Sequence, residues 1–288
     1  MSGKFTVACV QTNSTRDVAE NLSAIVPMIG EARRRGATLV CLPEVVGMIE
    51  PRRRLLLEKV ETEETNRGLA GFRETAKRLS LWLLVGSLSV KVGPDRVANR
   101  SYLIDQDGAV RASYDKIHMF DVSLEGGESY RESATFRAGE TAMLADTPWG
   151  PLGMTVCYDL RFPQLYRALA QAGAMYLTIP AAFTRPTGRA HWQVLVRARA
   201  IETGCFVFAA AQCGEHAEGR RTYGHSLIVA PWGEILAEAG EEVGVITAEI
   251  DPAKVDEARR MVPSLQHDRP FSPPASIPRA TIRRAAGE

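Results

Sequence analysis

Cys157 is the residue of this sequence whose surroundings are most typical of a nucleophile. It ends the apolar run LGMTVC and precedes a predicted helix whose first turn contains Pro163. Free cysteine is more often a small buried hydrophobe than a reactive group. The position between a strand and a helix favours reactivity, because the partial positive charge at a helix N-terminus stabilises a thiolate. The backbone N–H groups that follow, beginning with that of Tyr158, are placed to donate to an oxyanion.

Two charged residues end other predicted strands and are candidate partners of this cysteine. A histidine is the usual partner, but the surroundings of Cys157 do not match the papain-type pattern. Glu44 ends the stretch TLVCLPE, and Lys116 ends VRASYDK. A charged residue at a strand end usually marks only where the chain meets water. Solvent exposure accounts for one charged residue at a strand end more easily than for a set of one Glu, one Lys and one Cys that all end strands.

Composition excludes several classes of function. Among 288 residues, 35 are Lys or Arg and 34 are Asp or Glu, so the formal net charge of +1 does not indicate a nucleic-acid partner. No HExxH motif or paired ligand spacing is present, and we expect no metal. The N-terminal residues run directly into a strand pattern, which predicts no signal peptide and no membrane contact. The five cysteines are an odd number without CxxC spacing, which favours a reducing, cytoplasmic environment.

Strand patterns alternate with helical patterns along the chain and must position these residues. The predicted strands cover residues 5–11, 38–44, 81–90, 102–105, 109–116, 142–146, 152–157, 175–180, 205–212, 226–230, 235–239 and 243–250. The predicted helices cover 18–35, 68–79, 163–171 and 190–203, and a last helix begins at about residue 251. Hairpin turns are predicted at Asp107-Gly108 and at Pro231-Trp232-Gly233, and residues 117–140 are predicted to form an active-site loop.

This order of elements predicts an α/β fold of mixed sheets covered by helices. No internal repeat, low-complexity block or linker divides the chain. We therefore expect a single domain over residues 1–270, followed by a C-terminal tail over residues 271–288.

Longer motifs around the three strand ends resemble those of the nitrilase superfamily of carbon–nitrogen hydrolases. The resemblance extends over residues 7–270 and is carried by LPE, YDKIHMFD, CYDLRFPQLYRALAQAGA, PAAFTRPTGRAHWQVLVRARAIETGCFVFAAAQCG and YGHSLIVAPWGEI. It implies a four-layer α-β-β-α sandwich, assembly as a homodimer or higher homo-oligomer, and a Glu-Lys-Cys triad that needs no cofactor. The second half of the chain looks most like the branch of deaminated glutathione amidases and omega-amidases.

The resemblance also implies a role for each residue of the triad. Glu44 would be the general base, and Lys116 would stabilise the oxyanion together with the Tyr158 N–H. Cys157 would form a thioester with the acyl part of a linear amide. Glu132 matches an additional glutamate that members place beside the lysine and the substrate.

Further residues near the triad are candidates for support and for substrate binding. Glu125, Glu128 and Glu140 share the loop with Glu132 and are alternatives to it. We expect Asp159 and Arg161 to pair and to brace the turn, with Arg161 also able to reach a substrate carboxylate.

The loop that begins at residue 180 supplies the remaining substrate-binding candidates. Phe183 is a candidate substrate contact, and Arg185 and Arg189 would add positive charge. Such charge suits deaminated glutathione, which would be hydrolysed to 2-oxoglutarate and cysteinylglycine.

Other functions remain open from the sequence. The alternatives within enzymes are an omega-amidase acting on 2-oxoglutaramate and an N-carbamoyl amino-acid amidohydrolase. The alternative outside enzymes is a catalytically silent scaffold or binding protein that keeps the fold.

Overall fold

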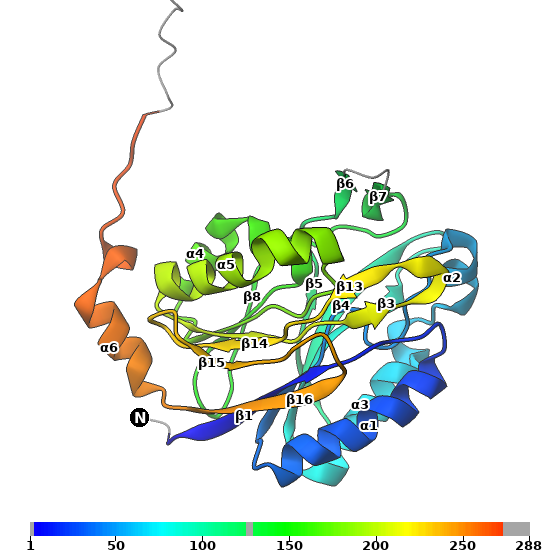
Figure 1. Ribbon diagram of the computed structural model, residues 1–288, viewed down its shortest axis with the longest axis horizontal. Coiled ribbons are helices and arrows are strands. Elements are labelled where there is room, and N and C mark those ends of the chain that lie inside the picture. The colour runs from blue at the N-terminus through cyan, green and yellow to red at the C-terminus, as the bar shows by residue number, and fades with distance from the viewer. Residues whose placement is uncertain (1–2, 125–128, 273–288) are drawn as a thin grey trace, which may run out of the picture.

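Two six-stranded mixed sheets pack face to face between two layers of helices (Figure 1). The computed structural model describes residues 3–124 and 129–272. In spatial order, the first sheet contains β16 (Gly244–Ile250), β1 (Phe5–Gln11), β2 (Leu39–Cys41), β3 (Trp82–Lys91), β4 (Val97–Ile104) and β5 (Val110–Asp115). The second sheet contains β15 (Ile235–Glu238), β14 (Leu227–Val229), β11 (Phe206–Ala209), β10 (Tyr176–Thr178), β9 (Leu152–Met154) and β8 (Met143–Ala145).

Helices cover the outer faces of both sheets. α1 (Val18–Arg34) and α3 (Arg67–Leu79) lie on the first sheet, and α4 (Pro163–Gln171) and α5 (Arg185–Thr203) lie on the second (Figure 1). The predicted α/β fold, a four-layer α-β-β-α sandwich, is confirmed. α2 (Arg53–Lys59) and α6 (Ala253–Met261) lie outside these layers.

The alternation of side chains in β1 explains why the first sheet is covered on both faces. Val7 and Cys9 belong to the apolar core that the two sheets share. Ala8 and Val10 point the other way, into the core beneath α1 and α3. Because successive side chains of a strand face opposite sides, a strand buried on both faces has apolar residues at successive positions, as residues 7–10 of β1 do.

Most predicted elements are present, with two corrections. α5 begins at Arg185 rather than at residue 190, because Pro186 is accommodated in the first turn of the helix. The segment 117–140 is not a featureless loop. It contains a small hairpin of β6 (Asp121–Ser123) and β7 (Ser129–Arg131), and a short 3-10 helix at Glu132–Ala134.

The strand directions bring the candidate residues to one edge. β1, β2 and β3 are parallel, and β5 has the same direction because β4 is antiparallel to both of its neighbours. Glu44 follows β2 and Lys116 follows β5, so both lie at the same edge of the first sheet. Cys157 follows β9 in the second sheet, which packs against the first. The site therefore lies where strand ends of the two sheets meet.

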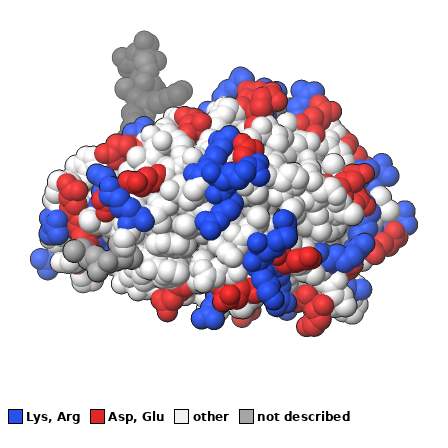
Figure 2. Space-filling model, turned by 90° about the horizontal axis from the view of Figure 1, so that it is seen from below, with Lys and Arg blue, Asp and Glu red and all other residues white. Residues whose placement is uncertain are grey.

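The surface carries both signs of charge. On the face shown in Figure 2, Lys and Arg side chains are interspersed with Asp and Glu. Within residues 3–124 and 129–272, no helix is both long enough and apolar enough to span a membrane. The division into a domain over 1–270 and a tail stays a prediction, and residues 273–288 of that tail lie outside the described part of the chain.

Candidate active site

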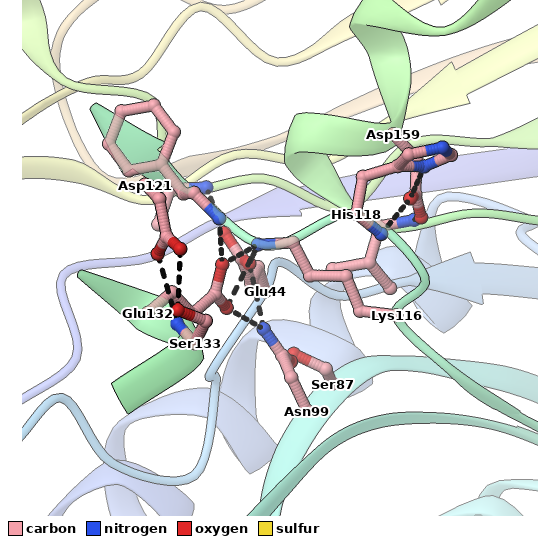
Figure 3. A network of polar contacts seen from close by, with 12 residues as sticks. Glu44, Ser87, Asn99, Lys116, His118, Asp121, Glu132, Ser133 and Asp159 are labelled. Atoms are coloured by element: carbon pink, nitrogen blue, oxygen red, sulfur yellow. Dashed lines mark hydrogen bonds and ion pairs between the residues drawn. The ribbon is translucent and has the colours of Figure 1, made fainter. Parts of the chain in front are cut away.

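Lys116 lies at the centre of a buried ionic cluster. Its side chain is 2% exposed, and its Nζ donates to Glu44 Oε1 at 2.9 Å and to Glu132 Oε2 at 2.8 Å. Figure 3 shows the ammonium between the two carboxylates. Burial opposes the charge of Lys116, but Glu132 and Glu44 outweigh it and hold the pKa of the ammonium well above 10.5. The lysine is therefore a fixed positive charge at neutral pH.

Glu44 is held at both carboxylate oxygens. Oε2 accepts a hydrogen bond from the backbone N–H of Ala182 at 2.9 Å, while Oε1 faces Lys116. The next residue, Val45, has a φ of 48°, a left-handed conformation that is strained for a β-branched residue. Ser87 in β3 stabilises this turn, because its hydroxyl accepts from the Val45 N–H at 2.8 Å. Burial raises the pKa of Glu44, but Lys116 outweighs it and leaves the carboxylate ionised.

Asn99 completes the cluster and was not identified from the sequence. It lies in β4 and is 2% exposed. Its Nδ2 donates to Glu44 Oε1 at 2.9 Å and to Glu132 Oε1 at 3.2 Å, so one amide holds the two carboxylates together (Figure 3). The only signal in the sequence is a polar residue inside an apolar strand, and this does not indicate which face of the sheet it occupies.

Glu132 is the loop glutamate that reaches Lys116. Its Oε2 also accepts from the backbone N–H of Phe120 at 2.7 Å, which attaches the 3-10 helix to the segment after the lysine. Glu140, one of the alternatives, is exposed. The other two, Glu125 and Glu128, lie outside the described residues.

Cys157 begins a short 3-10 helix, Cys157–Arg161, that immediately precedes α4. Its φ of 50° is again left-handed, and its backbone N–H donates to Pro180 O at 2.9 Å. The N–H of Tyr158 belongs to the first turn of this helix, where amides have no intrahelical acceptor. The turn thus presents a buried thiol, 7% exposed, next to a backbone donor.

The protonation of Cys157 differs from the sequence-based expectation. Proximity to a helix N-terminus favours a thiolate, but burial and the negative charge of Glu44 raise the pKa of the thiol well above 9.0, despite the opposing effect of Lys116. The free site therefore holds a neutral thiol beside an ionised carboxylate.

Asp159 braces the turn, but not through Arg161. Its Oδ2 accepts from Tyr114 Oη and from the Val156 N–H, both at 2.8 Å. Its Oδ1 accepts from the His118 N–H at 3.0 Å and lies 2.7 Å from His118 Nδ1 (Figure 3). The expected pair with Arg161 is absent among the described contacts, because the buried carboxylate already has four closer partners. Asp159 instead ties the turn of Cys157 to the strand and segment around Lys116.

The four central residues line one cavity of about 490 Å³. Glu44, Lys116, Glu132 and Cys157 all contribute to its wall, as do Tyr158 and Phe183. These six are the candidate residues that the structure brings together.

The three arginines expected to bind substrate lie outside the wall of the cavity. In the described chain, Arg161, Arg185 and Arg189 are not among the residues that line it. Arg161 lies over the rings of Tyr158 and Phe183, with Cζ to centroid distances of 5.8 and 5.5 Å. Among the described residues, the arginines that do line the cavity are Arg53, Arg131 and Arg220, which the sequence analysis did not select.

The described residues do not form a metal-binding group. Across residues 3–124 and 129–272, no cluster of three or more His, Cys, Asp or Glu side chains is arranged to hold an ion.

Comparison with known protein families matches residues 6–260 to the carbon–nitrogen hydrolases. The chain belongs to this family. The carbon–nitrogen hydrolase fold and the resemblance to the nitrilase superfamily are thereby confirmed, and the protein is an amidase of that superfamily.

Several relatives of this carbon–nitrogen hydrolase are named deaminated glutathione amidases. The deaminated glutathione amidase of Yersinia enterocolitica is 41% identical over 268 residues, which cover 91% of this chain and 92% of that protein. The human deaminated glutathione amidase is 41% identical and covers 92% of this chain and 82% of its own.

Solved structures of amidases and related proteins have the same fold as this chain. The Caenorhabditis elegans NitFhit protein superposes with a TM-score of 0.87 at 38% identity, over 93% of this hydrolase and 66% of that chain. An amidase from Nesterenkonia sp. AN1 superposes with a TM-score of 0.78 at 27% identity, over 92% of this chain and 94% of its own. In that structure the active-site cysteine carries the acetamide moiety of fluoroacetamide.

Proposed function

We propose that this amidase hydrolyses a linear amide through a thioester on Cys157, and that deaminated glutathione is its preferred substrate. The observation that carries the reaction is a buried carboxylate and ammonium in contact with each other, with a buried thiol in the wall of the same cavity. Buried charges are costly unless they are paired, so a cluster of this kind is typical of a site whose chemistry requires it.

In the first half of the reaction, Glu44 takes the proton from the Cys157 thiol as the sulfur attacks the amide carbon. Lys116 and the Tyr158 N–H donate to the oxyanion of the tetrahedral intermediate. Glu44 then gives the proton to the leaving nitrogen, the C–N bond breaks, and the acyl group remains on Cys157 as a thioester.

In the second half, Glu44 takes a proton from water, and the resulting hydroxide attacks the thioester carbon. The C–S bond breaks and the thiol recovers its proton, so the sum is amide plus water to acid plus amine. Glu132 keeps Lys116 protonated and in place throughout, because both of its carboxylate oxygens accept from the Lys116 ammonium, at 3.0 and 2.8 Å.

The substrate assignment is supported by the relatives named deaminated glutathione amidase at 41% identity. The cations in the cavity wall also suit a substrate with a carboxylate at each end. Intact glutathione has an ammonium in place of the 2-oxo group, and an unpaired buried ammonium costs several kcal/mol. We expect the enzyme to discriminate against glutathione by about a thousandfold.

The experiment is a comparison of kcat/KM for four amides on one preparation. The amides are deaminated glutathione, 2-oxoglutaramate, N-carbamoyl-β-alanine and intact glutathione. The highest value for deaminated glutathione is the expected result. A lead for 2-oxoglutaramate would indicate an omega-amidase, and one for the carbamoyl compound would indicate an N-carbamoyl amidohydrolase. No turnover that depends on Cys157 would favour the silent scaffold.

A further inference from the structure

We propose that Arg220 binds the carboxylate of the acyl part of the substrate and so selects acyl groups that end in an anion. This inference rests on the amidase function proposed above and concerns the same cavity. Arg220 follows a short 3-10 helix, Ala217–Gly219, and precedes β13 (Arg221–Tyr223), far along the chain from the triad. It lines the cavity together with Cys157 and Lys116.

The guanidinium of Arg220 retains unused donors. Its Nη2 donates to Ala182 O at 3.2 Å, and its Cζ lies 5.7 Å from the centroid of the Tyr130 ring. Its Nε is buried and has no hydrogen-bond partner among the described residues. In the described part of the chain no carboxylate forms an ion pair with this arginine. A buried N–H without an acceptor is uncommon, and it indicates a position that a ligand atom fills.

The other arginines near the site are already paired or exposed. Arg185 forms an ion pair with Glu241 at 2.6 Å, and Arg161 Nη2 lies 3.3 Å from His191 Nδ1. Arg53 and Arg131 line the cavity but are exposed. Arg220 is half-buried, so its charge is screened less by water.

The charge balance of the buried ionic cluster around Lys116 also favours a further cation beside an anionic acyl group. Glu44 and Glu132 contribute two carboxylates against the single ammonium of Lys116. An anionic acyl group that enters this cavity is repelled by the excess negative charge unless another cation compensates it. Arg220 lines the same cavity as Glu44, and its positive charge helps to lower the pKa of that carboxyl. A guanidinium binds a carboxylate through two parallel N–H donors, so it also fixes the direction of the acyl chain.

The loop that carries Arg220 is held on both sides. Glu218, with a φ of 60°, forms ion pairs with Arg16 at 2.7 Å and with Arg52. His216 is buried, with Nδ1 3.0 Å from Ser14 O. Side chains that are fixed before binding lose less entropy when the ligand arrives, which favours affinity and specificity.

The acyl end is the better match for this arginine than the leaving group. The leaving amine must depart to solvent before water attacks the thioester, whereas the acyl group stays in the cavity through both steps. The half-buried Arg220 therefore suits the acyl carboxylate, and the exposed Arg53 and Arg131 suit the carboxylate of the leaving group.

The test is a change in selectivity measured with matched substrates. Ammonia release is followed for 2-oxoglutaramate and for its methyl ester, in wild type, Arg220→Gln, Arg220→Lys and Arg221→Gln. Arg221 is the control, since it is exposed, pairs with Glu215 at 3.0 Å and is not part of the cavity wall. We expect Arg220→Gln to lower the ratio of kcat/KM for acid over ester on the order of 50-fold. Arg220→Lys should recover part of the ratio, and Arg221→Gln should leave it unchanged.

A second measurement does not depend on turnover. Binding of 2-oxoglutarate is expected to protect Cys157 from alkylation by iodoacetamide, and Arg220→Gln should raise the concentration required for half protection by a similar factor. An equal loss for acid and ester, with unchanged protection, would show a merely structural role and overturn the proposal. The same variant is also compared on deaminated glutathione and on its C-terminal amide. If Arg220→Gln lowered only the preference for the free C-terminal carboxylate, Arg220 would bind the leaving group instead.

The two proposals fail in different ways. Turnover that is lost in Cys157→Ala, combined with an unchanged acid-to-ester ratio in Arg220→Gln, overturns only the role of Arg220. If none of these amides is turned over in a way that depends on Cys157, the amidase function is overturned. The role of Arg220 in binding the acyl carboxylate is then overturned with it.

Discussion

At the scale of single residues, the site is a set of opposed charges from which water is largely excluded. Lys116 contacts two carboxylates and Asn99 holds the same two, so each charge has a partner although little water reaches them. The thiol of Cys157 is the neutral member of the group, because burial and Glu44 raise its pKa. A neutral thiol is less prone to oxidation than a thiolate, and in the proposed mechanism Glu44 deprotonates the sulfur only during attack.

The roles of the triad predict a graded loss of activity. Cys157→Ala removes the nucleophile and should abolish turnover. Glu44→Gln and Lys116→Ala should each lower kcat/KM by about a hundredfold or more, since a base or an oxyanion donor is lost. The control is Glu140→Gln, an exposed glutamate of the same region, which should retain wild-type kinetics. Near-wild-type activity of Glu44→Gln would show that another group is the base.

The pKa directions predict a broad pH optimum. Activity requires an ionised Glu44, a protonated Lys116 and a Cys157 thiol. The pKa of Glu44 is lowered from 4.5, so the loss of enzyme activity on acidification should occur below pH 4.5. The pKa of Lys116 is raised well above 10.5 and that of Cys157 well above 9.0, so the alkaline loss should begin above pH 9.0. A kcat/KM profile with a titration between pH 6 and 8 would contradict this assignment.

At the scale of elements, Gly86 in β3 allows the two sheets to approach at the site. A Cβ on this glycine would lie 2.0 Å from Leu42 O, 2.4 Å from Pro43 O and 2.5 Å from Pro180 Cβ. These residues precede Glu44 in one sheet and Ala182 in the other. The packing of β3 against both strand ends thus sets the distance between the base and the segment that binds it.

Gly86→Ala should therefore separate the strand ends and impair the site. We expect a loss of about 1–3 kcal/mol in the free energy of unfolding, typical of overpacking, and a fall in kcat. Gly244→Ala in β16 is the matched control, because a Cβ there meets no atom within 4 Å. Urea denaturation and steady-state kinetics measure both effects. Equal free energies of unfolding for the two variants would show that β3 can move away from the residues before Glu44 and Ala182 without cost.

The sequence was sufficient for the elements and for residues at strand ends, and insufficient for contacts across the molecule. That Glu44, Lys116 and Cys157 lie in one cavity was predictable, because each follows a strand within a distinctive motif. Asn99 was not, because its orientation depends on the register of β4 with its neighbours. Arg220 was missed because only the folded loop brings it into the cavity.

Asp159 and Cys157 show a second limit of sequence-based prediction. The partners of Asp159 come from the segment around Lys116 as well as from its own turn, so local spacing with Arg161 was misleading. The neutral state of Cys157 depends on burial between two sheets, which no local pattern of the sequence encodes.

At the scale of the whole molecule, exposed apolar residues lie on α5 and in the turn between β14 and β15. Val194 and Ile201 on α5 are 68% and 55% exposed, and Trp232 in the turn is 51% exposed. The neighbouring Gly233 lies against Ile201, which makes the two regions continuous. Apolar residues clustered on a surface in this way are typical of protein–protein contacts.

The homodimer predicted from the sequence is therefore expected to form through this surface. Val194→Glu should convert the dimer to a monomer when the mass is measured by light scattering after size-exclusion chromatography. Val110→Glu, at a partly exposed apolar residue of β5, is the control and should not change the mass. A wild-type protein that is monomeric at micromolar concentration would contradict the prediction.

The pairing of β1 with β16 has a consequence for how the protein is made. Phe5 pairs with Ile250 and Gln11 with Gly244, so β1 is synthesised long before the strand that covers its edge. At about 5–20 residues per second, the roughly 230 residues between these strands take on the order of ten to fifty seconds to synthesise. During that time the apolar sequence FTVACVQ has an open edge, which favours aggregation. Messages truncated before the codon for residue 244 would produce chains that keep this edge permanently, and we expect them to depend on chaperones or to be degraded.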